Sequence, residues 1–359
     1  MEERKNAVDK SAAAAKAALA RAAAAPRAES VEGRSQAAGA ALAAPAGERG
    51  DAGEPGAGAA SAQAVLDGTH VRQRYPRPKG GHQLVLNDIS FRVPEPDFVS
   101  VVGPSGCGKS TLLRLILGSE SPYQGTVRVR GKIVGHPDRN RGIVFQRYSL
   151  FPHLTVVQNV MFGLELDGTW LLQKWLTWPW YRPTHRRYLE TAMQYLATVK
   201  LDEHASKYPH QLSGGMQQRV AIAQAMIMKP EILLMDEPFG ALDPGTRENL
   251  QVTIVETFRQ QHTTIFFVTH DLEEAIFVGN RLFVLSPFYQ ADADDEADDG
   301  GSHGSKLVMD VLTPRCETTG DKQRGEFAEF IGHVRQQGFD PSHRQRVAEF
   351  DLSAAPSAP

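Results

Sequence analysis

The chain has 359 residues with 39 Lys or Arg and 42 Asp or Glu, and its formal net charge of −3 gives no support to nucleic-acid binding. Hydrophobic residues make up 41% and charged residues 23%, as in ordinary globular proteins. Two cysteines, Cys107 and Cys316, are too few for a disulfide framework and fit a reducing compartment, and no apolar run approaches the ~20 residues of a membrane-spanning helix.

The first 64 residues are dominated by Ala, Gly, Pro, Glu and Arg and contain almost no large apolar side chains. Such a segment cannot bury enough apolar surface to offset the chain entropy that folding would cost. We therefore expect residues 1–64 to be a disordered extension, in which residues 12–25 have the propensity for a fraying helix. A docking or targeting arm is the alternative to plain disorder.

From Val65 on, short apolar runs alternate with segments of helical spacing. Strands are expected over residues 84–86, 89–93, 98–102, 126–129, 143–145, 232–235, 265–269, 282–285 and 306–311. Helices are expected over residues 111–117, 156–166, 186–199, 217–228, 249–261 and 326–335. This alternation predicts a parallel sheet covered on both faces, with a mostly helical insertion at residues 150–230. No internal repeat is present, so one such domain is expected.

A glycine-rich loop follows the apolar strand predicted at residues 98–102. It reads Gly103, Pro104, Ser105, Gly106, Cys107, Gly108, Lys109 and Ser110. The loop fits the pattern G-x-x-x-x-G-K-[ST], whose backbone N–H groups surround phosphate oxygens at the start of a helix. In this pattern Lys109 reaches the β- and γ-phosphates, Ser110 binds Mg²⁺ and Thr111 can add a phosphate contact. A glycine-rich turn without a ligand is the alternative.

Two adjacent acids, Asp236 and Glu237, follow the apolar strand predicted at residues 232–235. The strand would place Asp236 at its carboxyl end, beside the glycine-rich loop, where the carboxylate can hold Mg²⁺ through water. Glu237 lies one residue further along and can polarise an attacking water molecule. Paired acids after a strand also occur for structural reasons, so the pair does not identify the site by itself.

A second glycine-containing segment, Leu212 to Gln218, precedes a predicted helix and contains Ser213, Gly214, Gly215 and Gln217. A serine and two glycines at a helix start can bind an anion, and a simple helix cap in a flexible turn is the alternative. The helical insertion separates this segment from the first loop, so one rigid chain is not expected to fold both onto one nucleotide. Two chains could do so, each offering Ser213 to the γ-phosphate held by the other.

Together and in this order, the three motifs resemble those of the ATP-binding cassette (ABC) ATPases. The resemblance implies an α/β fold: a P-loop NTPase core of RecA type with an antiparallel β subdomain and an inserted α-helical subdomain. It also implies hydrolysis of ATP with Mg²⁺ by a head-to-tail dimer. The family's switch histidine, its Q-loop glutamine next to the Mg²⁺ site, its D-loop aspartate and its adenine-stacking aromatic residue correspond to His270, Gln146, Asp243 and Tyr75. For Tyr75, an ordinary strand-edge tyrosine is the alternative.

Three longer pieces, residues 138–146, 208–216 and 236–243, are similar to the importer ATPases of the nitrate, sulfonate and taurine group. This similarity implies an ATP-hydrolysing subunit that drives uptake of a small polar or anionic solute. The implied partners are a second ATPase subunit, identical or paralogous, a transmembrane permease and, indirectly, a periplasmic or extracellular solute-binding protein. The expected location is the cytoplasmic face of the membrane, with no nucleic-acid partner.

A soluble ABC ATPase that acts on ribosomes or DNA is the alternative function. Translation-type members carry two cassettes in one chain, whereas this chain has one. DNA-repair members place a long coiled coil between the phosphate loop and the second glycine motif. Residues 111–211, which occupy that interval, contain no sustained heptads. Both features count against this alternative.

The resemblance covers residues 65–287 with a weaker continuation to 311, so we assign the ATPase domain to residues 65–312. Three segments depart from the family's pattern. All four tryptophans lie in residues 169–183, where a membrane- or permease-facing loop and a local apolar cluster both explain them. The acidic, glycine-rich segment 291–301 is expected to be a solvated loop, with metal binding as the alternative. Residues 313–359 are expected to be a C-terminal extension too short for a ligand-sensing domain.

Overall fold

The computed structural model describes residues 64–350 except 79, 147–148, 169–177, 241, 262, 292–294, 296, 315–324 and 348–349. The predicted N-terminal extension therefore lies almost entirely outside the described residues, as do Trp170, Trp175 and the side chains of Trp178 and Trp180. Every element described below belongs to one compact unit, which lies within residues 60–359.

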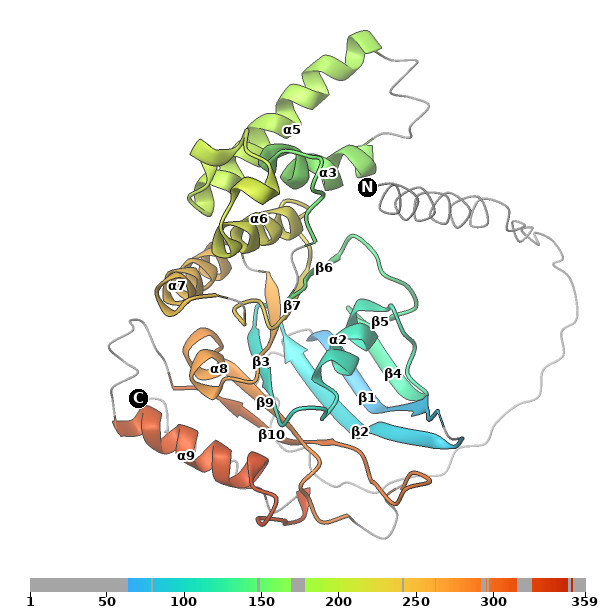
Figure 1. The fold of residues 1–359 in the computed structure, drawn as a ribbon. Helices are drawn as coiled ribbons and strands as arrows, with labels where there is room; N and C mark the ends of the chain where they lie inside the picture. Colours follow the sequence, from blue (N-terminus) through green and yellow to red (C-terminus); the bar gives the residue numbers. More distant parts are fainter. Residues whose placement is uncertain are drawn as a thin grey trace, which may run out of the picture. The chain divides into compact units, whose positions relative to one another are not determined.

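One sheet is antiparallel, with the strand order β2-β1-β4-β5 (Figure 1). Its strands are β1 (Ala64–Pro76), β2 (His82–Pro94), β4 (Gln124–Val129) and β5 (Lys132–Ile133). β1 is absent from the predicted strands, because shifts in its register with both neighbours interrupt the alternation of its apolar residues. β2 joins the two short strands predicted at residues 84–86 and 89–93. The polar pair Asn87 and Asp88 forms a bulge within it, with Asp88 at a φ of 54°.

The second sheet has six strands in the order β10-β9-β3-β8-β7-β6. They are β3 (Phe98–Val102), β6 (Arg141–Val144), β7 (Ile232–Asp236), β8 (Thr264–Val268), β9 (Arg281–Ser286) and β10 (Lys306–Leu312). β6, β7, β8, β3 and β9 run parallel, and β10 pairs with β9 in the antiparallel sense. The segments that follow the parallel strands therefore meet at one edge of the sheet.

The helices are α2 (Lys109–Leu117), α3 (Val156–Gly168), α5 (Trp178–Thr198), α6 (Gly214–Met226), α7 (Pro244–Gln261), α8 (Leu272–Val278) and α9 (Gly325–Phe339), with short 3-10 turns η1 (Asp202–His204) and η2 (Pro209–Gln211). α2 packs between the two sheets in the main apolar core. α3, α5 and α6 share a separate core, and they are the predicted helical insertion (Figure 1). No helix among the described residues is both long enough and apolar enough to span a membrane.

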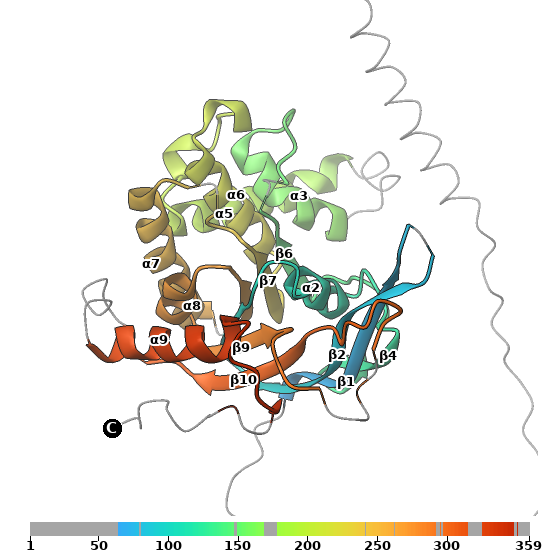
Figure 2. The ribbon, with the colours of Figure 1, turned by 60° about the horizontal axis from the view of Figure 1, so that its bottom comes forward.

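The C-terminal residues complete one face of the six-stranded sheet. α9 lies along β9 and β10 (Figure 2), and its Phe327, Phe330 and Val334 are buried against Val284 of β9 and its neighbours. Phe350 joins the same apolar cluster. The C-terminal segment therefore contributes to the folded core although it lies outside the family's sequence pattern.

Two acids of the acidic segment 291–301, which is predicted to be a solvated loop, have side chains that are shielded from water. The side chain of Asp298 is 1% exposed and pairs with Arg77, and that of Asp295 is 7% exposed and pairs with Lys306. Each carboxylate can leave water because a cation from another part of the chain replaces its hydration. Among the described residues, no group of three or more His, Cys, Asp or Glu could hold a metal ion.

Candidate active site

The glycine-rich loop joins β3 to α2, as the sequence predicts, and its backbone is shaped by glycine. Gly106 and Gly108 have φ values of 81° and 98°, a region that other residues rarely adopt. Gly108 is the residue before the first turn of α2, so the loop runs directly into a helix N-terminus. Free N–H groups and the positive end of the helix dipole therefore face the same space, which suits an anion.

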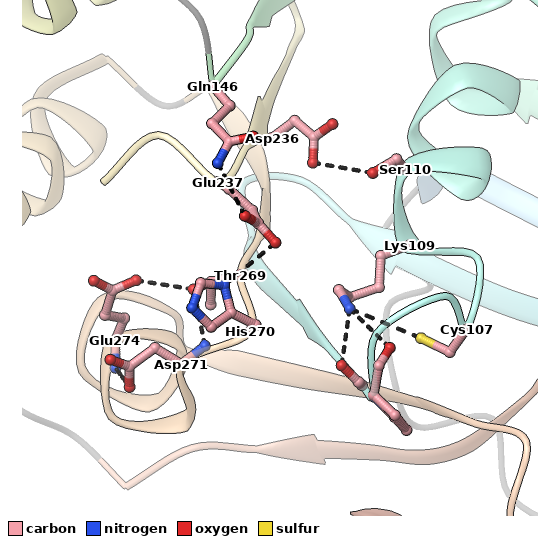
Figure 3. A network of polar contacts seen from close by, with 12 residues as sticks. Cys107, Lys109, Ser110, Gln146, Asp236, Glu237, Thr269, His270, Asp271 and Glu274 are labelled. Carbon is pink, nitrogen blue, oxygen red and sulfur yellow. Dashed lines mark hydrogen bonds and ion pairs between the residues drawn. The ribbon is translucent and has the colours of Figure 1, made fainter. Parts of the chain in front are cut away.

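Lys109 is buried within this loop (Figure 3). Its Nζ donates to the carbonyl oxygens of Gly103 at 2.8 Å and Pro104 at 3.1 Å, and it lies 4.0 Å from Sγ of Cys107. The loop's own carbonyls thus hold the ammonium group beside the N–H groups that would face a phosphate. Burial raises the pKa of the Cys107 thiol, so this cysteine stays protonated and unreactive at neutral pH.

Gly103 accepts no larger side chain. A Cβ atom there would overlap the carbonyl oxygen of Leu285 in β9 and lie 2.6 Å from Sγ of Cys107. We expect Gly103→Ala to lower the free energy of unfolding by about 1–3 kcal/mol, because backbone must shift to relieve the overlap. Urea denaturation measures the change, with Gly135→Ala as control because a Cβ there has no neighbour within 4 Å. Equal stability of the two variants would show that the loop is not tightly packed.

Ser110 of the glycine-rich loop and Asp236 of the acidic pair are in direct contact. Asp236 is the last residue of β7, and Ser110 Oγ donates to its Oδ1 at 3.3 Å (Figure 3). Burial raises the pKa of Asp236, although the hydrogen bond from Ser110 acts in the opposite direction. A cation bound here would favour the ionised carboxylate. The hydroxyl and the carboxylate are oxygen ligands of the kind that Mg²⁺ prefers.

Glu237 links two further predicted residues. Its Oε2 accepts from Nε2 of Gln146, which follows β6, at 3.3 Å. Its Oε1 lies 3.3 Å from Nδ1 of His270, which comes after β8 (Figure 3). The backbone of Glu237 is left-handed, with a φ of 45°, and its N–H donates to the carbonyl of Val268 at 2.9 Å. The structure therefore brings Gln146, Glu237 and His270 together in one cluster beside Asp236.

The sequence predictions do not include a group of buried polar contacts next to His270. Oγ1 of Thr269 donates to Oε2 of Glu274 at 2.8 Å and accepts from the N–H of Asp271 at 3.1 Å. Glu274 also pairs with Arg247 at 3.4 Å, and burial raises its pKa. These contacts fix the backbone on both sides of His270. The spacing of Asp271 and Glu274, a helix cap followed three residues later by an acid, is the signal that could have predicted α8 here.

The second glycine motif lies apart from this cluster. Ser213 is the N-cap of α6, and its Oγ accepts from the N–H of Met216 at 3.4 Å. Gly214 and Gly215 begin the helix, and a Cβ on Gly215 would overlap Thr246 of α7. Within the part of the chain that the structure describes, no hydrogen bond or ion pair joins Ser213 to the phosphate loop. Ser213 therefore caps α6, as the alternative interpretation expects, and its contact with a nucleotide stays a prediction.

Three more of the predicted site residues lie outside the central cluster, namely Gln217, Asp243 and Tyr75. Gln217 donates to the carbonyl of Leu212 at 3.1 Å, which braces the turn before α6. Asp243 accepts from the N–H of Thr246 at 3.0 Å at the start of α7, and this hydrogen bond lowers its pKa.

Tyr75 is the next-to-last residue of β1 and lies beside the helix that follows the phosphate loop. Its hydroxyl donates to Glu120 and accepts from Nη2 of Arg114 at 3.3 Å. Because Arg114 belongs to α2, Tyr75 contacts the helix that begins at the phosphate loop. This position is compatible with a contact to the base of a nucleotide whose phosphates lie in that loop.

Comparisons with known proteins agree with this arrangement. A family profile described as ABC transporter matches residues 86–240. The nitrate import ATP-binding protein of Synechocystis is 44% identical over 208 residues, which are 58% of this chain and 73% of that protein. The aliphatic sulfonates import ATP-binding protein of Bacillus cereus is 40% identical over 213 residues, which are 59% of this chain and 78% of that protein. A dimeric ATP-binding cassette solved in a post-hydrolysis state with ADP and phosphate aligns with a TM-score of 0.51 and 30% identity, over 61% of this chain and 93% of that one.

Proposed function

Since the chain belongs to the ABC transporter family of ATP-binding proteins, we propose that it is the ATP-hydrolysing subunit of an importer. In this proposal a dimer of cassettes couples ATP binding and hydrolysis to uptake of a small polar or anionic solute through a partner permease. Residues 65–312 form the ATPase domain. The similarity to nitrate and aliphatic sulfonate import proteins supports both the direction of transport and the class of solute. It does not favour an ATPase that acts on ribosomes or DNA.

One observation supports the ATPase activity: side chains that follow three separate strands form one set of contacts, which reaches the phosphate loop through Asp236 and Ser110. Ser110 meets Asp236, and Glu237 contacts both Gln146 and His270. The loop and Lys109 would hold the phosphates of ATP. Glu237 would then polarise the attacking water, while His270 would contact the γ-phosphate and help to orient that water.

The oxygens at this site fit Mg²⁺. Ser110 Oγ and Asp236 Oδ1 lie 3.3 Å apart, and Gln146 contacts the neighbouring Glu237. The described residues hold no larger acidic cluster, so most other ligands would come from phosphate oxygens and water, as is usual for this ion. When bound, Mg²⁺ would neutralise charge on the phosphates during transfer.

Ser213 and Asp243 would act in the dimer. Ser213, at the N-terminus of α6, would offer its hydroxyl and nearby N–H groups to the γ-phosphate held by Lys109 of the second chain. Asp243 would lie at the interface between the chains. The dimeric arrangement of the similar ATP-binding cassette supports this role. The second chain could be an identical copy or a paralogue.

ATP-driven closure would be transmitted through Gln146. This residue follows β6, contacts Glu237 and leads the chain toward α3 of the helical subdomain. Closing the dimer would move α3, α5 and α6 together with a permease bound to them, and hydrolysis would reset the pair. The subunit would then work at the cytoplasmic face of the membrane, with a solute-binding protein acting on the other side.

An affinity purification from detergent-solubilised native membranes tests this function. The bait is the Glu237→Gln variant with Mg-ATP, which should accumulate the closed, permease-bound state, and Lys109→Ala with the same tag is the matched control. We expect mass spectrometry to identify a permease, accompanied by a solute-binding protein, with Glu237→Gln and far less of both with Lys109→Ala. Recovery of ribosomes or DNA-bound proteins without any membrane protein would overturn the transport function and leave the ATPase assignment intact.

A further inference from the structure

The segment between β9 and β10 is attached to β2 at both of its ends. The hydroxyl of Tyr289 accepts from Nδ2 of Asn87 at 3.3 Å and donates to the carbonyl of His303 at 2.9 Å. Ser305 forms a bridge to β2: its N–H donates to the carbonyl of Val85, and its carbonyl accepts from the N–H of Asn87, both at 2.9 Å. Burial raises the pKa of Tyr289 to about 12, so its hydroxyl remains a neutral donor.

The tip of this segment is organised around Asp298. Its Oδ1 accepts from the N–H groups of Gly300 at 2.8 Å and Ser302 at 2.9 Å, which closes a compact turn. Its Oδ2 lies 2.7 Å from Nη2 of Arg77, and the Asp298 side chain is only 1% exposed. The carboxylate of Asp298 is shielded from water and takes its hydrogen bonds from these protein groups, while Arg77, whose side chain is 33% exposed, supplies the opposite charge. Asp298 therefore binds the segment firmly to Arg77.

The same tip packs closely against the turn between β1 and β2. Oδ2 of Asp299 accepts from the N–H of His82 at 2.6 Å. A Cβ on Gly81 would lie 2.5 Å from that oxygen, and a Cβ on Gly300 would overlap the guanidinium of Arg77. The tip and the turn each have a glycine at the contact, because a larger side chain would not fit there. A shift of one would therefore change the position of the other.

This contact lies next to Tyr75. In the β1–β2 pairing Tyr75 is opposite Gln83, and Pro76 is opposite His82. Arg77 and His82, which the segment holds, are the residues just beyond Tyr75 on the two strands of the hairpin. Any displacement of the hairpin end would therefore move Tyr75 relative to α2 and the phosphate loop.

We propose that residues 297–305, together with Tyr289, are a strap that pre-positions Tyr75 for the base of ATP, with Asp298 as the positioning residue. This inference rests on the proposed function, because it takes Tyr75 to be the residue that stacks on adenine. With the strap in place, the hairpin end is ordered before the nucleotide arrives, so ATP binding does not bear that entropic cost. The strap lies on the base side of the nucleotide, so it should affect affinity and leave the chemistry at Glu237 unchanged.

The Asp298→Asn variant tests the strap. Asparagine keeps an acceptor for Gly300 and Ser302 and removes the charge opposite Arg77. We expect the Kd and the KM for ATP to rise roughly tenfold, as for an interaction that orders a binding element, with kcat unchanged at saturating ATP. Glu190→Gln is the matched control, because it removes the same charge from an exposed pair with Arg186 and should change neither constant.

A second comparison separates positioning from general stability. In a Tyr75→Ala background, which itself should weaken ATP binding, Asp298→Asn should have no further effect, because the strap acts through Tyr75. Additive losses, a fall in kcat, an unchanged KM for Asp298→Asn, or wild-type affinity in Tyr75→Ala would each overturn the proposal. If Asp298→Asn does not fold, Asp299→Ala removes only the acceptor for His82 and permits the same comparison. Wild-type affinity in Asp298→Asn, alongside lost binding in Lys109→Ala, would refute the strap and leave the proposed function standing.

Discussion

Replacement of Glu237 by glutamine should leave ATP binding intact and slow hydrolysis about a hundredfold or more, the usual contribution of a positioned base. The carboxylate oxygens contact Gln146 and His270 at 3.3 Å each, so the side chain is held on both sides. Glutamine has the same shape and tolerates the left-handed backbone at this position as well as glutamate does. Its neutral amide can still accept a hydrogen bond from water but is too weak a base to take up the proton, so only the rate of hydrolysis should fall.

Phosphate release at saturating ATP gives the turnover of this variant, and titration calorimetry gives its affinity. Glu273→Gln is a suitable control, because Glu273 is an exposed acid in the first turn of α8 and has no contact with Glu237. Because the variant binds ATP without consuming it, size-exclusion chromatography with ATP should also show a dimer that the wild type forms only transiently. Turnover within a few fold of wild type would remove Glu237 from the catalytic role.

Much of this site could be predicted because parallel strands end at one edge of a sheet. Apolar β-branched runs mark β3, β7 and β8 in the sequence, and the residues that follow them must then lie close together. The glycine-rich motif identifies Ser110, and this rule places Asp236 and Glu237 beside it. The hydrogen bond between Ser110 and Asp236 agrees with that placement. The resemblance to ABC ATPases adds His270 and Gln146, whose contacts with Glu237 give them a common location.

Contacts between distant segments could not be predicted in the same way. Asp298 and Arg77 are 221 residues apart, and a run of acids is expected to stay in water unless tertiary structure supplies a partner. Glu274 and Arg247 pair across two helices whose relative position no local pattern encodes. The cap at Ser213 is local and was therefore predictable, whereas its role toward a second chain depends on an interface that one chain does not contain.

The conversion of Lys109 to alanine should raise the Kd for ATP about a hundredfold or more. Hydrogen bonds from a charged donor contribute about 1.5–3 kcal/mol each, and two such bonds to phosphate oxygens account for at least a hundredfold. Nζ of Lys109 is already positioned by the carbonyls of Gly103 and Pro104, so binding requires little reorganisation of this side chain. The variant loses the positive charge and the hydrogen bonds that hold the ammonium group in place.

Calorimetric titration with Mg-ATP measures the effect, and two further variants make it interpretable. Lys109→Met keeps most of the buried aliphatic chain, so an equal loss of affinity in both variants would assign the effect to the ammonium group. Lys132→Ala removes an exposed lysine from β5 and should bind as the wild type does. A thermal unfolding curve separates lost binding from lost folding. Wild-type affinity in a folded Lys109→Ala protein would mean that ATP does not occupy this loop, and Ser110, Asp236 and Glu237 would then have no phosphate to act on.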